Sequence, residues 1–373
     1  MNYNIQIYKL PKNNDFNSFI KDDNLVINSP YENHPLFTLG YHHFISRTRE
    51  AMSIPEIVDK KNELFYVVNP FEPNIRDYED SLNNIIKVYL KQDIELRDFY
   101  KFWEMCFIFD IIDGENLNIM VLNDSGESQA IQLYREKFLN KQSKKDKYYT
   151  EYKKKISADI IVANNISNKE NKLVEVLLEQ LINSLNCQNK NGHLILKIGD
   201  TYTSPTLKII YLLTTLYKEC YLYKPFFSRP SDNEKYIICK NFDFTNIKPI
   251  ISNLETILKS SKTNYITDIF LDLDITNQDL YHTFKLINIK LINQQQININ
   301  NIVKYIKDNN YYGDKYHEYR NQQIEASKWW INNFLPENNT LYKTNKEFFE
   351  KNTKSTIEKH FLEKEKFLNQ LSH

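Results

Sequence analysis

Glycine is scarce in this chain, which has only six glycines among its 373 residues. Because glycine lets a backbone pass close to a bound nucleotide, a glycine-rich nucleotide-binding loop is hard to build from so few. Long apolar runs are missing as well. No stretch approaches the length that crosses a bilayer, and residues 1–14 have no apolar core of signal-peptide length. We therefore expect an intracellular protein that does not enter the membrane.

Closely spaced cysteines and an excess of either charge are also lacking. The four cysteines are scattered, without a CxxC pair: Cys106, Cys187, Cys220 and Cys239. We therefore expect no disulfide framework and no metal site, and a reducing compartment fits. Since the formal net charge is zero, any nucleic-acid binding must use a local basic patch.

Apolar residues are plentiful, at 41% hydrophobic and 14% aromatic, which is enough for a buried core. Short apolar strands are predicted over 63–71, 117–122, 159–163, 193–198, 221–225 and 235–239. Helices are predicted over 77–92, 95–112, 128–138, 173–185, 204–219 and, as charged helices, within 316–373. This alternation predicts an α/β fold. We expect a mostly parallel twisted sheet with helices on both faces and an antiparallel final hairpin.

Three segments carry a family signature when they are taken together. They are FYKFWEM (99–105), GHLILKIGD (192–200) and KPFFSRPSDNEKYIICKNF (224–242). In order and spacing, the region from about 40 to 335 resembles FtsJ-like RNA 2′-O-methyltransferases, and specifically the cap-directed branch of large DNA viruses. The resemblance implies a Rossmann-like methyltransferase core over 93–245. An N-terminal extension (1–92) and a mainly helical C-terminal extension (246–373) would pack around that core.

The family works with a Lys-Asp-Lys-Glu tetrad, and the resemblance places three of its members on Lys101, Lys197 and Glu234. Such residues suit the chemistry, because a ribose 2′-hydroxyl becomes a good nucleophile only when a neighbouring amine takes its proton. Lys197 would be that base. Without the resemblance, Lys197 and Glu234 would be an ordinary strand-end ion pair, and Lys101 a side chain that reaches the surface.

The tetrad's aspartate is the position at which this chain departs from the family. There the aspartate ends a strand that another aspartate begins. Here the strand begins with Asp159, and the catalytic position holds Asn164. Asparagine keeps the shape of aspartate but lacks the charge that orients an ammonium group.

The family's cofactor is S-adenosylmethionine. The glycine-rich loop that binds this donor in the family corresponds here to the stretch from 122 to 129. The candidate cofactor-binding residues are Asn123, Asp124, Ser125, Gly126 and Asp159. One glycine remains in the loop, and Glu127 would bring a negative charge near the donor's carboxylate. The resemblance therefore implies a degenerate donor pocket. Asp146 and Glu151 are the candidates for binding the donor's ribose.

A basic run over 141–155, interleaved with tyrosines, is the candidate RNA-binding segment. Its candidate contacts are Lys144, Lys145, Lys147, Tyr148, Lys153 and Lys154. A solvated loop is an equally good interpretation. The pair Trp329-Trp330 is expected to pack back on the body of the protein or, alternatively, to stack on a cap base. His42-His43 lacks metal-ligand spacing.

Two functional hypotheses follow from this combination. The first is a cap 2′-O-methyltransferase relative with lost or weakened catalysis, acting as an RNA-binding or partner-binding subunit in mRNA processing. The second is an active S-adenosylmethionine-dependent RNA 2′-O-methyltransferase that uses Lys197 as its base. A purely structural protein is a third and weaker alternative.

Overall fold

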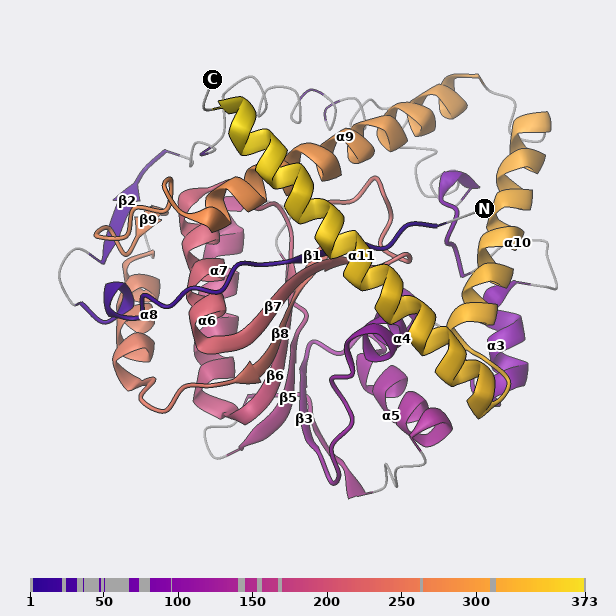
Figure 1. Cartoon of the computed structure of the whole chain (residues 1–373), viewed down its shortest axis with the longest axis horizontal. Coiled ribbons are helices and arrows are strands. Elements are labelled where there is room, and N and C mark those ends of the chain that lie inside the picture. The colour runs from indigo at the N-terminus through magenta and orange to yellow at the C-terminus, as the bar shows by residue number, and fades with distance from the viewer. Residues whose placement is uncertain are drawn as a thin grey trace.

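A seven-stranded sheet lies at the centre of the computed structural model (Figure 1). The structure describes residues 3–21, 25–31, 36, 47, 50, 67–73, 81–94, 96–139, 145–152, 156–166, 170–261, 264–308 and 313–371. The strands of this sheet are β1 (Gln6–Lys9), β3 (Asn118–Leu122), β4 (Lys147–Tyr149), β5 (Ala158–Ala163), β6 (Gln188–Ile198), β7 (Tyr217–Lys224) and β8 (Lys235–Phe242). Their spatial order is β1-β7-β8-β6-β5-β3-β4. A separate two-stranded sheet pairs β2 (Val26–Ser29) with β9 (Tyr265–Ile269).

Both parallel and antiparallel pairing occur in the large sheet. Strands β4, β3, β5 and β6 run parallel to one another, so their carboxyl ends meet at one edge. Strand β8 runs antiparallel between β6 and β7, and β1 adds antiparallel to β7. The α/β fold with its final antiparallel hairpin is therefore confirmed. Strand β1, from the N-terminal region, was not predicted to join this sheet.

Helices cover both faces of the sheet. They are α3 (Leu82–Leu90), α4 (Arg97–Phe109), α5 (Glu127–Phe138), α6 (Glu170–Cys187), α7 (Ser204–Leu216), α8 (Lys248–Ser260), α9 (Asp279–Lys307), α10 (Asp314–Phe334) and α11 (Asn339–Leu371), with a 3-10 turn at Asn17–Phe19. Figure 1 shows α6 and α7 on one side of the sheet and α4 and α5 on the other.

Side chains of a strand point alternately to the two faces, and the two hydrophobic clusters follow that rule. In β5, Ile161 and Ala163 belong to the cluster beneath α6 and α7. Ile160 and Val162 of the same strand belong to the cluster beneath α4 and α5. Because both faces are buried, the strands are continuously apolar rather than alternating.

Helix α4 lies between the sheet and the C-terminal helices, which explains its aromatic sequence. From Phe99 to Phe107 every residue is buried, and Trp103 donates from Nε1 to the carbonyl of Phe334, 2.8 Å away. Trp330 of α10 is fully buried and donates from Nε1 to Glu104 Oε1 at 3.0 Å. The predicted packing of Trp330 against the body is confirmed.

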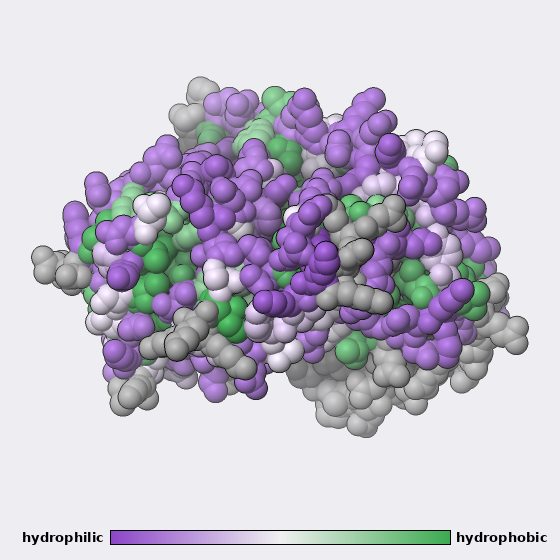
Figure 2. Space-filling model, turned by 90° about the horizontal axis from the view of Figure 1, so that it is seen from below, coloured by the Kyte–Doolittle hydropathy of each residue, from purple (hydrophilic) through white to green (hydrophobic). Residues whose placement is uncertain are grey.

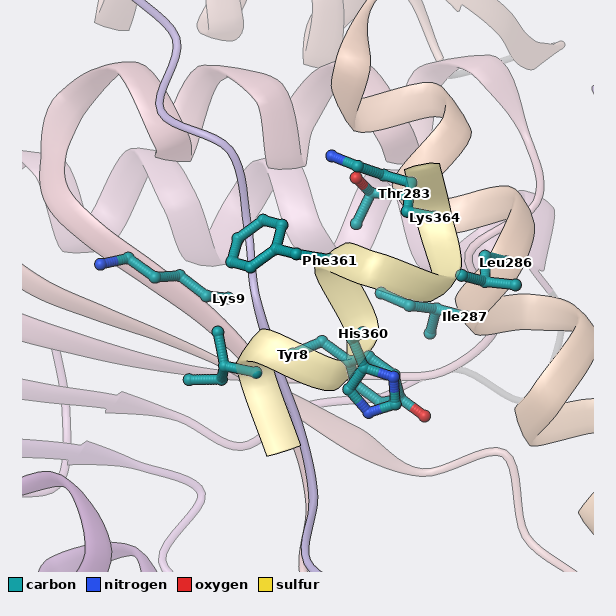
Figure 3. Close-up of a pocket in the computed structure, with 9 residues that line it drawn as sticks. Tyr8, Lys9, Thr283, Leu286, Ile287, His360, Phe361 and Lys364 are labelled. Atoms are coloured by element: carbon teal, nitrogen blue, oxygen red, sulfur yellow. The ribbon is translucent and has the colours of Figure 1, made fainter. Parts of the chain in front are cut away.

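Helix α11 crosses the edge of the sheet over β1 and α9, and Figure 3 shows the small hollow that remains beneath it. The Tyr8 ring stacks on His360 with centroids 4.3 Å apart. Lys364 lies 2.7 Å from Asp279 Oδ1 at the start of α9. The hollow is a seam between packed elements, because its lining is mainly apolar and its polar members are already paired.

Some local predictions need correction. The strand predicted over 63–71 lies mostly outside the described residues, and Val67 and Val68, which are described, are helical. The helix predicted over 204–219 ends earlier, at Leu216, and β7 begins at Tyr217. The division into three parts at 92 and 245 stays a prediction.

The surface is mainly polar. Figure 2 shows separate hydrophobic patches on one face, divided by hydrophilic side chains. Among the described residues, no helix combines the length and apolarity needed to cross a membrane.

The ion pair between Arg135 and Asp146 is fully buried and offers a test of the fold. The two side chains are 1% and 0% exposed, and Arg135 Nε lies 2.7 Å from Asp146 Oδ2. Arg135→Ala leaves a buried carboxylate unpaired, so we expect the free energy of unfolding to fall by about 3–5 kcal/mol in denaturant titrations. Lys315→Ala, which breaks an exposed pair with Glu318, is the control and should change it far less. If both substitutions lowered the free energy of unfolding equally, the Arg135–Asp146 pair would not be buried as described.

Candidate functional site

Four charged side chains form a closed ring at the carboxyl edge of the parallel strands. Lys101 Nζ lies 2.6 Å from Asp98 Oδ1 and 2.6 Å from Glu234 Oε2. Lys197 Nζ lies 3.2 Å from Asp98 Oδ2 and 2.7 Å from Glu234 Oε1. Each lysine therefore touches both carboxylates, and each carboxylate touches both lysines. We call these four residues the charge ring.

Local structure explains why the ring closes. Asp98 and Lys101 are three residues apart on α4, so their side chains lie on one face of the helix. Lys197 is the penultimate residue of β6, and it pairs with Tyr236 of the antiparallel strand β8. The end of β6 therefore meets the start of β8, which Glu234 precedes. The structure thus brings together Lys101, Lys197 and Glu234, as the sequence predicted.

The ring is largely buried, because its side chains are only 5% to 13% exposed. Burial alone would raise the pKa of Glu234, but Lys101 and Lys197 outweigh burial and hold this pKa well below its usual range. The pKa of Asp98 is lowered by the same two lysines against the same effect of burial. Two full negative charges therefore face the two lysines.

Lys197 is correspondingly held as an ammonium. Burial would lower its pKa, yet the charges of Glu234 and Asp98 prevail and raise it above its ordinary value. A lysine takes a proton from a hydroxyl only when it is unprotonated, so the ring in this state disfavours Lys197 as a base. As an ammonium it can donate hydrogen bonds to an oxygen.

Lys224 holds the backbone of the segment that carries Glu234, and it was not identified from the sequence. Its buried Nζ donates to the carbonyl oxygens of Asp232 and Glu234, at 2.8 and 2.9 Å. Burial lowers the pKa of Lys224 to about 8. Ser228 Oγ donates to Glu234 Oε2 at 3.0 Å. Glu234 is thus fixed through both its backbone and its side chain.

Asn164 lies at the end of β5 and reaches the ring through Asp98. Its Nδ2 donates to Asp98 Oδ2 at 3.4 Å, to the carbonyl of Asn123 at 3.3 Å and to Glu127 Oε1. Among the described residues, its buried Oδ1 has no hydrogen-bond partner. The sequence placed Asn164 correctly at this edge but missed Asp98. The available signal was an acidic residue one helical turn before Lys101.

The loop between β3 and α5 satisfies its own backbone. The N–H groups of Gly126 and Ser128 donate to Asp124 Oδ1 at 3.1 and 3.2 Å, and the N–H of Ser125 donates to Glu127 Oε2. These are the groups that a glycine-rich loop would offer to a ligand carboxylate. In this loop the protein's own carboxylates occupy them.

The loop's glycine does not give a ligand closer access. Gly126 has a φ of 109°, and a Cβ there would lie 3.2 Å from the backbone nitrogen of Phe99 and 3.3 Å from Leu96 Cβ. Gly126 therefore serves a left-handed turn packed against the start of α4. The predicted cofactor-binding residues 123–126 lie together, but they face partners within the protein.

Glu127 fills the space between the ends of β3 and β5. It is fully buried, and burial raises its pKa to about 8. Its two oxygens accept from Asn164 and from the backbone of Ser125. Both oxygens of this side chain are therefore engaged within the protein.

The other predicted site residues are scattered. Asp159 is the second residue of β5 and lies at the opposite edge of the sheet from the ring. There it accepts from the N–H of Asn118 at 2.9 Å and from Asn189 Nδ2 at 2.6 Å. The structure therefore does not bring Asp159 to the loop. Asp146 is held by Arg135, whereas Glu151 is exposed just beyond β4.

Only part of the predicted RNA-binding segment is described. Lys145 and Lys147 are exposed, and Tyr148 packs against the core cluster beneath α4. Lys144, Lys153 and Lys154 lie outside the described residues, as do His42 and His43. Within the described residues, no cluster of histidine, cysteine or acidic side chains has the arrangement of a metal site.

Comparison with known proteins connects this geometry to one family. Residues 128–242 match the model of the FtsJ-like methyltransferases. A cap-specific mRNA (nucleoside-2′-O-)-methyltransferase 1 of Dictyostelium discoideum is 32% identical over 124 residues, which is 31% of this chain and 16% of that protein. An uncharacterised protein of Acanthamoeba polyphaga mimivirus is 30% identical over 142 residues, 38% of this chain and 40% of its own length.

A third relative, the methyltransferase of the same name from Caenorhabditis elegans, is 28% identical over 160 residues, 40% of this chain and 17% of that protein. The matched region thus spans less than half of each of these relatives. The family match begins at residue 128, directly after the loop that Glu127 closes.

The lowered pKa of Glu234 predicts how the free energy of unfolding depends on pH. The pKa of Glu234 is lower in the folded protein than in the unfolded chain, where it is about 4.3, so its ionised side chain stabilises the fold above that pH. This contribution is lost as the pH falls through the folded pKa. We expect Glu234→Gln to lower the free energy of unfolding by about 3 kcal/mol at pH 7, because one carboxylate then faces two buried ammonium groups. The difference from the unsubstituted protein should shrink progressively below about pH 4 in denaturant titrations.

Ser228→Ala is the matched control, since it removes a hydrogen bond to Glu234 but no charge. Its cost should change far less over the same pH range than that of Glu234→Gln, because one hydrogen bond affects the pKa of Glu234 less than two charges do. A Glu234→Gln difference that is equally independent of pH would show that Glu234 is not held as a charged group.

Proposed function

We propose that this chain, which carries an FtsJ-like methyltransferase domain over residues 128–242, binds RNA at the charge ring and has a weakened site for S-adenosylmethionine. One observation carries the proposal: buried Glu127 occupies the donor loop and accepts hydrogen bonds from Ser125 N–H and Asn164. FtsJ-like methyltransferases use S-adenosylmethionine as donor. Here the side of the site that would hold the donor is closed by the chain itself.

Capped mRNA is the RNA that we propose, because two of the relatives are cap-specific mRNA 2′-O-methyltransferases by name. The charge ring suits a ribose 2′-hydroxyl on chemical grounds. A hydroxyl both donates and accepts hydrogen bonds, and the ring offers ammonium donors beside carboxylate acceptors. The ribose would reach the ring at Asp98, Lys197 and Glu234, whose side chains keep 11% to 13% of their surface exposed.

Phosphate contacts away from the ring would come from the basic segment at the amino end of β4, because Lys147 begins that strand and lies at the opposite edge of the sheet from the ring. Lys145 and Lys147 are exposed on it, and Lys144, Lys153 and Lys154 belong to the same proposal. Tyr148 would position this segment by packing rather than stack on a base, because it lies against the core cluster. Such contacts make binding steeply dependent on salt.

An RNA-binding role without efficient methyl transfer fits a subunit of an mRNA-processing assembly, and we propose that role. One of the relatives is a mimivirus protein, so the host cytoplasm or the virion would be the place of action.

An active RNA 2′-O-methyltransferase is the second candidate, and the complete charge ring favours it. Two lysines and two carboxylates are present, as in the family's tetrad. In that case Lys197 would have to lose a proton before it could accept one from the 2′-hydroxyl, against the charges of Asp98 and Glu234. Donor binding distinguishes the two candidates.

Calorimetric titration with S-adenosylmethionine tests the closed loop. We expect no measurable binding by the unsubstituted protein at high micromolar donor. Glu127→Ala frees the Ser125 N–H and empties the space beside Asn164, so it should gain at least tenfold in affinity, about 1.4 kcal/mol. Glu127→Gln is the matched control: it keeps the volume of a side chain that a pKa of about 8 leaves mostly uncharged at pH 7, so binding should remain weak.

Two outcomes would contradict the proposal. Low-micromolar binding by the unsubstituted protein would favour the active enzyme, whose methyl transfer to capped RNA should then vanish in Lys197→Ala. A folded Glu127→Ala protein that binds no better than the unsubstituted one would show that Glu127 is not the obstacle.

A further inference from the structure

We propose that Asp98 positions Lys101 and Lys197 as the carboxylate partner that a strand-end aspartate would otherwise supply, so that the charge ring is complete without residue 164. The proposal rests on the proposed function only where it assigns these lysines to a ribose hydroxyl.

The geometry of Asp98 is that of a bridging group. Its two oxygens are divided between the lysines, with Oδ1 2.6 Å from Lys101 Nζ and Oδ2 3.2 Å from Lys197 Nζ. Lys197 comes from β6, so Asp98 joins a helix to the end of a strand. An ordinary helical ion pair of this spacing lies on the surface and connects only residues of one helix.

Charge balance makes Asp98 necessary. Without it, the ring would hold two buried ammonium groups and the single carboxylate of Glu234, and an uncompensated buried charge is strongly destabilising. Asp98 also lies in the first turn of α4, where the helix dipole favours a negative charge. The start of this helix is therefore a suitable place for the missing carboxylate.

Residues 98 and 164 constrain each other. The amide of Asn164 donates to Asp98 Oδ2 at 3.4 Å and to Glu127. An aspartate at 164 would instead place another negative charge beside Asp98, whereas Glu127, with a pKa of about 8, is already mostly protonated at neutral pH. Repulsion between the two carboxylates would raise the pKa of one of them. Once Asp98 supplies the charge, an amide at 164 is the better neighbour. Asn164 is thus the complement of Asp98.

An exchange of the two residues tests this inference. The variants are Asp98→Asn, Asn164→Asp and the double variant, and the readout is the side-chain pKa of Lys197 from NMR titration of labelled lysine amines. The groups that face Lys197 are Glu234, Asp98 and the Tyr236 ring. Asp98→Asn should lower the pKa of Lys197 by about one unit or more, and the double variant should restore most of that shift.

Asp93→Asn is the control, because Asp93 is exposed and pairs with Lys87 outside the ring. It should leave the pKa of Lys197 unchanged. If Asp98→Asn does not fold but the double variant folds with the original pKa, the inference also holds. An unchanged pKa in Asp98→Asn would overturn it, and so would a double variant that does not fold or does not recover the shift.

Binding of capped RNA with a 2′-hydroxyl or a 2′-deoxy first nucleotide separates this inference from the proposed function. If Asp98→Asn abolishes the preference for the hydroxyl and the double variant recovers it, Asp98 positions the lysines for ribose. Should the pKa pattern hold while the unsubstituted protein shows no preference, the proposed function fails and the pairing by Asp98 stands.

Discussion

Two ammonium groups share the same two carboxylates where helix α4 meets the ends of β6 and β8. Buried charges are tolerated only when they are paired and hydrogen-bonded, so this ring constrains the elements that carry it. Helix α4 must present one face to the sheet edge, β6 must end beside β8, and Lys224 must hold the segment before β8. The aromatic packing of α4 against Trp330 and the sheet keeps that helix in place. The fold and the site therefore depend on the same contacts.

The two halves of the site differ in their state. In the charge ring, where we propose that the ribose binds, two lysines face two carboxylates and the charges balance. On the donor side, Asp124 and Glu127 occupy the N–H groups of the loop, and Gly126 is used in packing against α4. Asn164 lies between the halves and hydrogen-bonds to both. Asn164 in place of the family's aspartate would, taken alone, suggest a damaged tetrad. Together with Asp98, it indicates a ring whose second carboxylate comes from α4 instead of from the end of β5. In our proposal the closed loop, rather than the asparagine, opposes methyl transfer.

The strands and helices of the core were predictable because continuous apolar strands alternate with amphipathic helices, and that pattern is local. Lys101, Lys197 and Glu234 were predictable from the family's spacing. Asp98 was not, because it replaces a residue of β5 from a different element, and a motif counted along β5 cannot reveal it. Asp159 was misplaced for a related reason: it lies near the amino end of β5, and the edge where ligands bind is at the carboxyl end of the parallel strands. Pairing of β1 with β7 joins residues more than 200 positions apart and has no local signal.

Fluorescence anisotropy of a labelled capped RNA, with and without S-adenosylmethionine, tests most directly whether the ribose side works while the donor side is closed. We expect the RNA to bind at low salt and to lose affinity steeply as salt rises. The methyl donor should leave that affinity unchanged, and the recovered RNA should carry no new 2′-O-methyl group. An affinity that rises with donor, accompanied by methylated RNA, would show that the loop opens and that the chain is an active enzyme.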